Sequence, residues 1–333
     1  MENKWSITEI WNETLLIQQG ERKYEPRDII WASEIGSPFI DRWLKMNATP
    51  VTNPYLPRTL RIFEAGHLFE WIVERVLRKT GLLIDTQQKA YFRPEDYPPE
   101  YGNLLGVWGR YDIEAGGKPD YQKALEFIKN DKLPSLLESI AIKIIEKFQT
   151  IYPDGLENLI LEVKSVNSLA FWAHLEELMQ AYKHHRMQLY TYMRYFKKDG
   201  KIIYISKDDL TIQEVNLSWQ DNELANLWQD DITKMTYYHK ENVQPPKEPN
   251  IVFNERKQEW EINKWKVGRS QFLTLLTGYK TPEEWEEVVQ KEVRKKNREL
   301  KCDEELKYFR KKYKDEFRKT KKEIEETENT ESE

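Results

Sequence analysis

The sequence predicts an α/β fold, in which a mixed central β-sheet is flanked by helices, with a helical region before it and a helical extension after it. Short apolar strand candidates alternate with amphipathic helices in the order strand, strand, helix, helix, hairpin, helix, which is typical of such a sheet. The chain has 333 residues, with 12 Trp, 18 Tyr and 12 Phe, enough for a large buried core.

The N-terminal part is predicted to be helical. Residues 28–45 are expected to form a helix that leads into a loop at 47–57, which is rich in proline and asparagine. A second helix is predicted over 60–79, because its apolar residues recur at helical spacing and Gly81 follows at the position where glycine often ends a helix.

Strands are predicted within 82–92 and 104–114, followed by a turn at Gly116 and Gly117. An insertion at about 120–152 is then expected to form two helices broken near Pro134. The elements predicted to complete the core are a strand at 159–165, helices at 169–180 and 184–197, a hairpin of 201–206 with 211–217, and a helix at 219–239.

The predicted core occupies residues 1–243. Residues 244–249 (QPPKEP) read as a linker, and 250–322 are predicted to be a helical C-terminal extension, in which Thr281 caps a long charged helix. Residues 323–333 form an acidic tail that is expected to be disordered. Apolar residues at helical spacing within the extension indicate that it packs on something, so this helix is a candidate contact for a protein partner.

Composition excludes several classes of protein. Hydrophobic residues make up 39% and charged residues 33%, and no run approaches the roughly 20 apolar residues of a membrane span. The N-terminus lacks a signal-peptide pattern, so a cytoplasmic protein without a membrane partner is expected. The net charge of -5 does not mark a nucleic-acid binder, although a nuclease needs only a local basic channel. Cys302 is the single cysteine, which excludes an intrachain disulfide and an iron–sulfur cluster held by cysteines of one chain.

The sharpest chemical signal is LILEVKS at 159–165. Side chains alternate faces along a strand, so Glu162 and Lys164 point the same way while Leu161 and Val163 point into the core. Upstream, Asp112 is expected in the middle of a strand, between Tyr111 and Ile113. Asp is a poor strand former, so this position requires a reason such as metal ligation; the alternative is an Asp on an edge strand that faces solvent with Arg110 and Glu114.

Two predicted helices carry further polar faces. A turn of about 100° per residue places His67, Glu70 and Glu74 within about 60° of one another, which offers an imidazole and two carboxylates on one side of the helix. In the later helix His184, Gln188 and Tyr192 recur every four residues. Each face taken alone would be read as an ordinary solvated surface.

Together these signals resemble the PD-(D/E)XK nuclease superfamily, and within it the RecB-like exonuclease branch that includes CRISPR-associated and mitochondrial genome maintenance exonucleases. The resemblance spans about residues 31–217 and rests on GHLFE, GRYD, EVKS and QLYTY in the expected order. It implies a restriction-endonuclease-like core. Iron–sulfur members of the branch use four cysteines, and the segment 32–39 (ASEIGSPF) has Gly36 or Ser37 where the first would stand, so the clusterless type is the closer relative.

The resemblance implies a site with one or two Mg²⁺ or Mn²⁺ ions. It assigns Asp112 and Glu162 to the metal, with the Val163 carbonyl as an extra oxygen, and His67 to a metal ion as the motif-one histidine. Lys164 would stabilise charge in the transition state as part of a catalytic set with the two carboxylates. The residues expected to position the nucleic-acid strand are Gln188 and Tyr192, and those expected to have supporting roles are Glu70, Glu74 and His184.

The implied function is a metal-dependent DNA exonuclease acting on single strands or DNA ends, in a pathway such as repair or recombination. A flap or junction endonuclease is an alternative within the same chemistry, and a catalytically inactive nucleic-acid-binding subunit is an alternative outside it. Trp108, Phe171 and Trp172 lie near the motifs and are expected either to stack on bases or to pack in the core.

Overall fold

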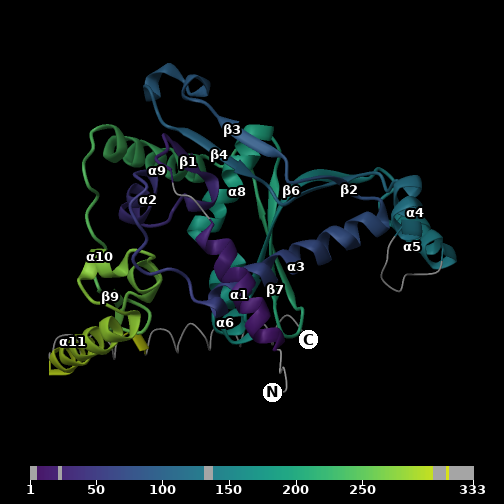
Figure 1. Ribbon diagram of the computed structural model, residues 1–333. Helices are drawn as coiled ribbons and strands as arrows, with labels where there is room; N and C mark the ends of the chain where they lie inside the picture. The colour runs from purple at the N-terminus through teal and green to yellow at the C-terminus, as the bar shows by residue number, and fades with distance from the viewer. Residues whose placement is uncertain (1–5, 22–24, 131–137, 303–312, 315–333) are drawn as a thin grey trace. The chain divides into compact units, whose positions relative to one another are not determined.

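The computed structural model describes residues 6–21, 25–130, 138–302 and 313–314 (Figure 1). It confirms a mixed α/β fold with sheets flanked by helices. The chain divides into two compact units, which are described separately: a first unit of residues 1–50 with 55–245, and a second unit of residues 51–54 with 246–333.

A five-stranded mixed sheet forms the centre of the first unit. Its strands lie in the order β2-β5-β6-β7-β8, and only β6 and β7 run parallel. Their bounds are Leu83–Thr86 for β2, Ile113–Gly117 for β5, Leu156–Val166 for β6, Gly200–Ser206 for β7 and Ile212–Leu217 for β8.

Helices cover both faces of this sheet. Leu161 and Val163 of β6 pack towards α3 (Pro57–Thr80), where Phe69 and Val73 meet them. Ile160, on the opposite face of the same strand, belongs to the main core together with α8 (Lys183–Phe196) and α9 (Asn222–Lys240). The side of β6 that also carries Glu162 and Lys164 therefore faces the α8 layer, as the alternation of side chains along a strand requires.

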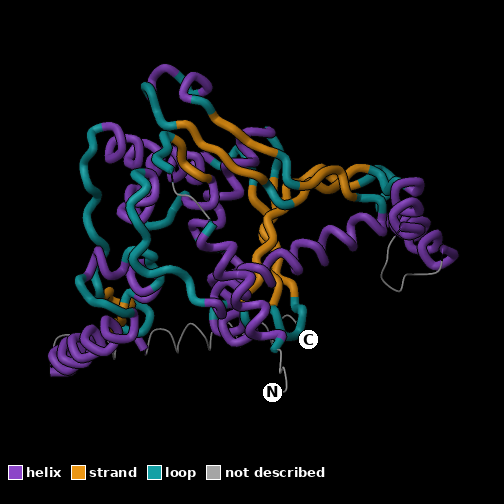
Figure 2. The backbone as a smooth tube through the Cα atoms, in the orientation of Figure 1, coloured by secondary structure: helices purple, strands orange, loops and turns teal. Residues whose placement is uncertain are grey.

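A second sheet of three strands, in the order β1-β4-β3, continues from the first (Figure 2). Its strands are β1 (Ile29–Trp31), β3 (Lys89–Phe92) and β4 (Gly106–Arg110), with β1 parallel and β3 antiparallel to β4. Because β2 pairs with β5 and β3 pairs with β4, the two pairs form one antiparallel ribbon that bends where it passes from one sheet to the other.

Backbone hydrogen bonds hold this bend. The Gln87 amide donates to the Asp112 carbonyl at 3.2 Å, and the Tyr111 amide donates to the Gln88 carbonyl at 3.3 Å. Gln87 adopts a φ of 56°, a left-handed conformation that is uncommon for a residue other than glycine. Strands are present within 82–92 and 104–114 as predicted, but the bend divides each segment into two strands. Asp112 was expected in the middle of a strand and lies at the bend instead.

The helix predicted over 28–45 was also wrong in its first half. Residues 29–31 form β1, a 3-10 turn follows at Ala32–Glu34, and the helix α2 covers only Phe39–Met46. Ile29 and Ile30 find backbone partners in β4, and a tertiary pairing of this kind overrides weak local helix propensity. Gly36, with a φ of 82°, separates the turn from the helix.

The other predicted helices of the first unit are present with shifted ends, except that the helix predicted over 169–180 is broken at His174 into two short helices. The predicted helix 60–79 is confirmed as α3, which ends at a left-handed Gly81. Figure 1 shows α3 running out towards the helices of the insertion. Pro134, the expected break between those helices, lies outside the described residues. The remaining helices are α1 (Ile7–Gly20), α4 (Tyr121–Asn130), α5 (Glu138–Ile151), α6 (Ser168–Ala173) and α7 (Leu175–Gln180).

A buried ion pair joins α2 to α9. Arg42 is 1% exposed, and its two terminal nitrogens donate to the two carboxylate oxygens of Asp231 at 2.6 and 3.0 Å. The Gly36 amide adds a contact of 3.3 Å to the same carboxylate. This two-pronged geometry fixes the segment after β1 against the helical layer.

The second unit is not purely helical, contrary to the expectation for 250–322. It contains an antiparallel hairpin of β9 (Ile251–Asn254) and β10 (Glu259–Ile262), because Trp260 and Ile262 pack against a small apolar core around Trp285. Thr281 accepts from the Glu284 amide at 3.1 Å at the start of α11 (Pro282–Cys302). Residues 303–312 and 315–333, which include the rest of the predicted extension and the acidic tail, lie outside the described residues. Two short elements complete the unit, the π-helical turn Lys264–Gly268 and α10 (Leu273–Thr277).

Candidate functional site

The bend of the ribbon places Asp112 beside β6. The pairing of β5 with β6 ends at Ile113 opposite Leu161, while β6 runs on to Val166. Beyond that point the Val163 amide donates to Oδ2 of Asp112 at 2.8 Å, so a side-chain carboxylate takes the place of a ladder partner. The contact involves the N–H of Val163. The prediction that the Val163 carbonyl oxygen is a metal ligand concerns a different atom and stays a prediction.

Glu162 is the buried centre of the site, with 1% of its surface exposed. Its Oε1 accepts from Lys164 Nζ at 2.5 Å and from Gln188 Nε2 at 2.6 Å. Its Oε2 is buried as well and has no hydrogen-bond partner among the described residues. A buried carboxylate oxygen left in this state is costly, and such an atom calls for an explanation such as an ion.

The electrostatics of the cluster favour an added cation. Burial, and then the neighbouring Glu162, raise the pKa of Asp112 well above its ordinary value, and burial also raises the pKa of Glu162. Burial alone would lower the pKa of Lys164, but Glu162 and Asp112 outweigh it, so this pKa is raised and the ammonium group stays charged at neutral pH. One ammonium group therefore leaves two crowded carboxylates incompletely neutralised.

Gln188 and Tyr192 both face the cluster from α8. Tyr192 is 1% exposed, and its hydroxyl makes hydrogen bonds with the Gln188 side chain and the Arg110 backbone. Gly109 makes room for this ring, because a Cβ there would lie 2.8 Å from Tyr192 Cε1 and 2.6 Å from the Cβ of Ala32. Tyr192 can therefore pack in this position only because residue 109 is a glycine.

The polar face of α3 meets the cluster through Glu70. Glu70 raises the pKa values of Asp112, Glu162 and Lys164, which shows that it lies within electrostatic reach of all three. His67 is 78% exposed at its side chain and lies 3.4 Å from Glu70 Oε2 through Nδ1. Glu74 instead pairs with Arg78 at 2.7 Å. Of the three residues predicted on this face, Glu70 is the one coupled to the buried carboxylates.

Two histidines at the start of α8 stand next to Lys164. Burial, and then Lys164, lower the pKa of His184 to about 4, so its imidazole is neutral at pH 7. His185, which the sequence analysis did not single out, has a pKa lowered well below its ordinary value by burial, and its Nδ1 lies 2.8 Å from the Tyr204 hydroxyl. The adjacent pair of histidines, four and three residues before Gln188, was the signal that could have found it.

The donor set suits a hard divalent cation. Within the described part of the chain, no group of three or more His, Cys, Asp or Glu side chains is arranged to enclose a metal ion. Mg²⁺, however, commonly keeps several waters and takes one or two carboxylates with substrate phosphates rather than a full protein cage. Asp112 and Glu162, whose Oε2 has no hydrogen-bond partner, fit that open type of site.

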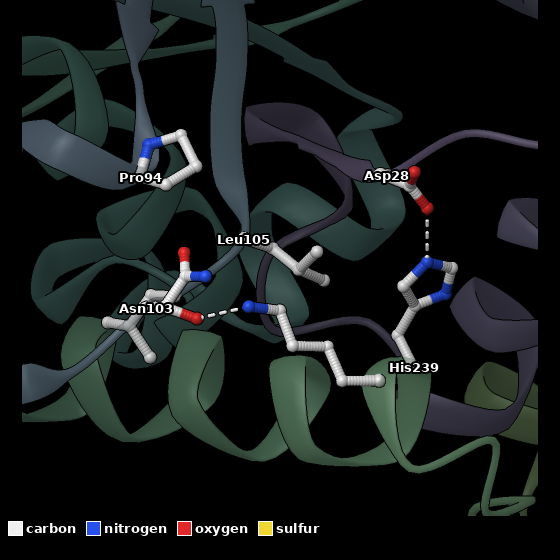
Figure 3. Close-up of a pocket in the computed structure, with 7 residues that line it drawn as sticks. Asp28, Pro94, Asn103, Leu105 and His239 are labelled. Carbon is white, nitrogen blue, oxygen red and sulfur yellow. Dashed lines mark hydrogen bonds and ion pairs between the residues drawn. The ribbon is translucent and has the colours of Figure 1, made fainter.

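A cavity of about 280 Å³ opens next to these residues. Gln188 and Tyr192 form one part of its wall, and the ends of β1 and β4, with Ser33 of the turn after β1, form the rest. Another cavity, of about 410 Å³, lies where β1 and β4 begin and includes Asp28, whose Oδ1 is 2.7 Å from Nε2 of His239 (Figure 3). It contains none of the predicted site residues, so the smaller cavity is the one associated with the cluster.

Comparisons with known proteins identify no family. No known protein family and no curated protein matches the chain. Among solved structures, the crystal structure of SSO0001 is similar over 82% of this chain and 97% of that chain, with 12% sequence identity and a TM-score of 0.45. No helix in the described residues is both long and apolar enough to span a membrane.

Proposed function

We propose that this protein is a metal-dependent nuclease that hydrolyses phosphodiester bonds of DNA, with exonuclease action on single strands or DNA ends. The observation that carries the proposal is the cluster of Asp112, Lys164 and Gln188 around the buried Glu162, which has one unsatisfied carboxylate oxygen. The resemblance of the motifs to RecB-like nucleases supports the same chemistry, and a clusterless member of that branch is the proposed relationship.

Asp112 and Glu162 would hold one or two Mg²⁺ or Mn²⁺ ions, with the Val163 carbonyl as a further oxygen ligand. A bound divalent ion supplies charge neutralisation at the phosphate and activates water at neutral pH. The ammonium group of Lys164 is held at 2.5 Å from Glu162 and stays charged, so it would stabilise the negative charge that builds on the phosphate oxygens.

The remaining residues would orient the reacting groups. Gln188 fixes the Glu162 carboxylate, and Tyr192 in turn fixes Gln188 through its hydroxyl. Glu70 and the exposed His67 would complete the outer side of the metal site, where solvent and substrate enter. His184 would remain a neutral hydrogen-bonding group near Lys164.

The proposal is tested by incubating end-labelled single- and double-stranded DNA with Mg²⁺, Mn²⁺ or EDTA. Wild-type protein is expected to shorten the DNA only when a metal ion is present, and Asp112→Ala and Lys164→Ala to abolish this shortening. Glu74→Ala is the matched control on α3, because its carboxylate pairs with Arg78 rather than with the cluster. Labels at the 5′ or 3′ end report the polarity of digestion.

Substrates with blocked ends separate the alternatives. An exonuclease leaves circular single-stranded DNA intact, whereas a flap or junction endonuclease cuts branched DNA whose ends are blocked. Binding of DNA without cleavage under every metal condition would refute the nuclease and establish a catalytically inactive nucleic-acid-binding subunit. The setting implied by the proposal is a cytoplasmic DNA repair or recombination process, in which the second unit could contact a protein partner.

A further inference from the structure

Three aromatic residues lie in one row across the three-stranded sheet. The strand registers pair Trp31 of β1 with Trp108 of β4, and Trp108 with Tyr91 of β3. Neighbouring strands lie about 4.8 Å apart, so the three aromatic side chains stand side by side on one face of the sheet. We call this set, Trp31, Trp108 and Tyr91, the aromatic row.

The aromatic row lies on the outer face of its sheet. Trp31 is 44% and Tyr91 41% exposed, whereas their strand neighbours Ile30 and Ala90 point inward and are fully buried. Gly106 contributes to this arrangement, because a Cβ there would lie 3.2 Å from Cε2 of Tyr91. Large exposed aromatics in register on one sheet face are far from the usual pattern of scattered surface hydrophobics and point to a ligand.

Positive charges border the aromatic row. Lys89 and Arg110 are direct cross-strand partners on the same face, and no described residue forms an ion pair with either of them. Arg110 lies 5.4 Å from the ring of Trp108. At the other side, the guanidinium of Arg27 lies 4.0 Å from the centre of the Trp31 ring and is already paired with Glu34 at 2.5 Å, so Lys89 and Arg110 are the cations available to a ligand. Flat apolar rings flanked by cations match the chemistry of a base and its phosphate.

The aromatic row is connected to the candidate site. The cavity of about 280 Å³ is lined by Trp31 and Trp108 of the aromatic row and by Gln188 and Tyr192, which face the carboxylate cluster. Gln188 then contacts Glu162 at 2.6 Å. A ligand on the aromatic row therefore reaches the neighbourhood of Glu162 through this cavity, past the C-terminal end of β4.

We infer that the aromatic row binds single-stranded nucleic acid by stacking unpaired bases, and guides the strand through this cavity to the carboxylate cluster. The inference rests on the proposed function and specifies its substrate as unpaired strand. Bases in a duplex already stack on one another, so only unpaired bases can cover the rings, while Lys89 and Arg110 meet the phosphates that accompany them.

Fluorescence anisotropy of labelled single-stranded DNA in EDTA tests the inference without cleavage. Trp31→Ala and Tyr91→Ala are expected to weaken binding by about 5- to 150-fold each, the range measured for loss of one stacked base. Trp31→Phe keeps a stacking ring and should recover most of the affinity. Trp265→Ala is the control, since this tryptophan is 53% exposed and belongs to the second unit.

Salt and strand type provide independent measurements on the same protein. Arg110→Ala should reduce the slope of log affinity against log salt by about 0.7, the value for one phosphate contact to a single strand. Duplex DNA of the same length is expected to bind more weakly than the single strand, with little effect of Trp31→Ala. Circular dichroism of each variant verifies that it is folded.

The outcomes separate this inference from the proposed function. Unchanged single-strand binding in folded Trp31→Ala and Tyr91→Ala overturns the aromatic row as a binding surface, even if metal-dependent cleavage is found. Equal losses for duplex and single strand also overturn it. Binding that depends on the aromatic row in a protein that never cuts DNA supports the inference and refutes the nuclease.

Discussion

Replacing Asp112 by Asn tests the idea that the buried cluster is built to receive a cation. The substitution removes one negative charge and keeps the shape of the side chain, and its amide oxygen can still accept from the Val163 amide. The crowding of Asp112 against Glu162 is thereby relieved, so the metal-free variant should be more stable than the wild type while it loses cleavage.

The pKa of Asp112 determines which of the two proteins is more stable and the pH range over which their stabilities differ. Its ordinary value of 3.8 is raised well upward in the folded protein by burial and by Glu162. The folded state therefore binds the proton more tightly than the unfolded state, and the wild type loses stability as the pH rises from about 3.8 through the folded pKa. The advantage of the variant should vanish near pH 3 and be complete once the wild-type carboxyl has ionised.

The expected gain is about 1–2 kcal/mol, within the range commonly found for single stabilising substitutions. For a unit of roughly 240 residues this corresponds to a rise in Tm of about 2–8 °C. Mg²⁺ should reverse the order, because ligand at 100 times its Kd adds about 2.7 kcal/mol to a protein that binds it. The wild type gains this stabilisation from Mg²⁺, and the variant loses most of it.

Thermal unfolding at neutral pH, with EDTA or with Mg²⁺, measures both effects. The prediction is a crossing: the variant is the more stable protein in EDTA and the less stable one in Mg²⁺. If Asp112→Asn is less stable than the wild type in EDTA, or if both proteins gain equally from Mg²⁺, the argument that this cluster is electrostatically incomplete without a cation is wrong.

Three further substitutions examine the supports of the site. Gly109→Ala forces a Cβ against Tyr192 and should cost about 1–3 kcal/mol of stability and most of the cleavage rate. Gly66→Ala is its control, because a Cβ there meets nothing within 4 Å, and it should be neutral or stabilising in denaturant unfolding. Asp231→Ala breaks the buried ion pair between α2 and α9 and should cost about 3–5 kcal/mol in the same measurement, with cleavage per folded molecule little changed. Glu70→Gln should alter the Mg²⁺ concentration required for half-maximal cleavage, and Glu74→Gln should leave it unchanged, as a metal titration of the rate will show.

The sequence predicted the elements of the site better than their connections. Alternation along 159–165 correctly separated Glu162 and Lys164 from Leu161 and Val163, because a period of two follows from strand geometry alone. The helix α3 and its end at Gly81 were predicted for a similarly local reason, the preference of glycine for the left-handed conformation.

Long-range pairing explains what sequence reasoning missed. Residues 29–31 become a strand only because β4, about 75 residues later in the chain, offers them backbone partners. The bend at Asp112 depends on hydrogen bonds to Gln87 and Gln88, which no pattern around Asp112 reveals. The contact of Gly109 with Tyr192 likewise joins segments about 80 residues apart. Local periodicity contains no information on such partners, so both the aromatic row and the position of Asp112 required the structure.

The bend of the ribbon has a mechanical consequence. Its outer half is anchored in the main core through Ala90 and Phe92 of β3 and Val107 of β4, and its inner half is anchored by the pairing of β5 with β6. Asp112 lies between these two anchored halves, where backbone hydrogen bonds join residues 87–88 to 111–112. Displacing its carboxylate would therefore require breaking packing or strand pairing on either side of the bend.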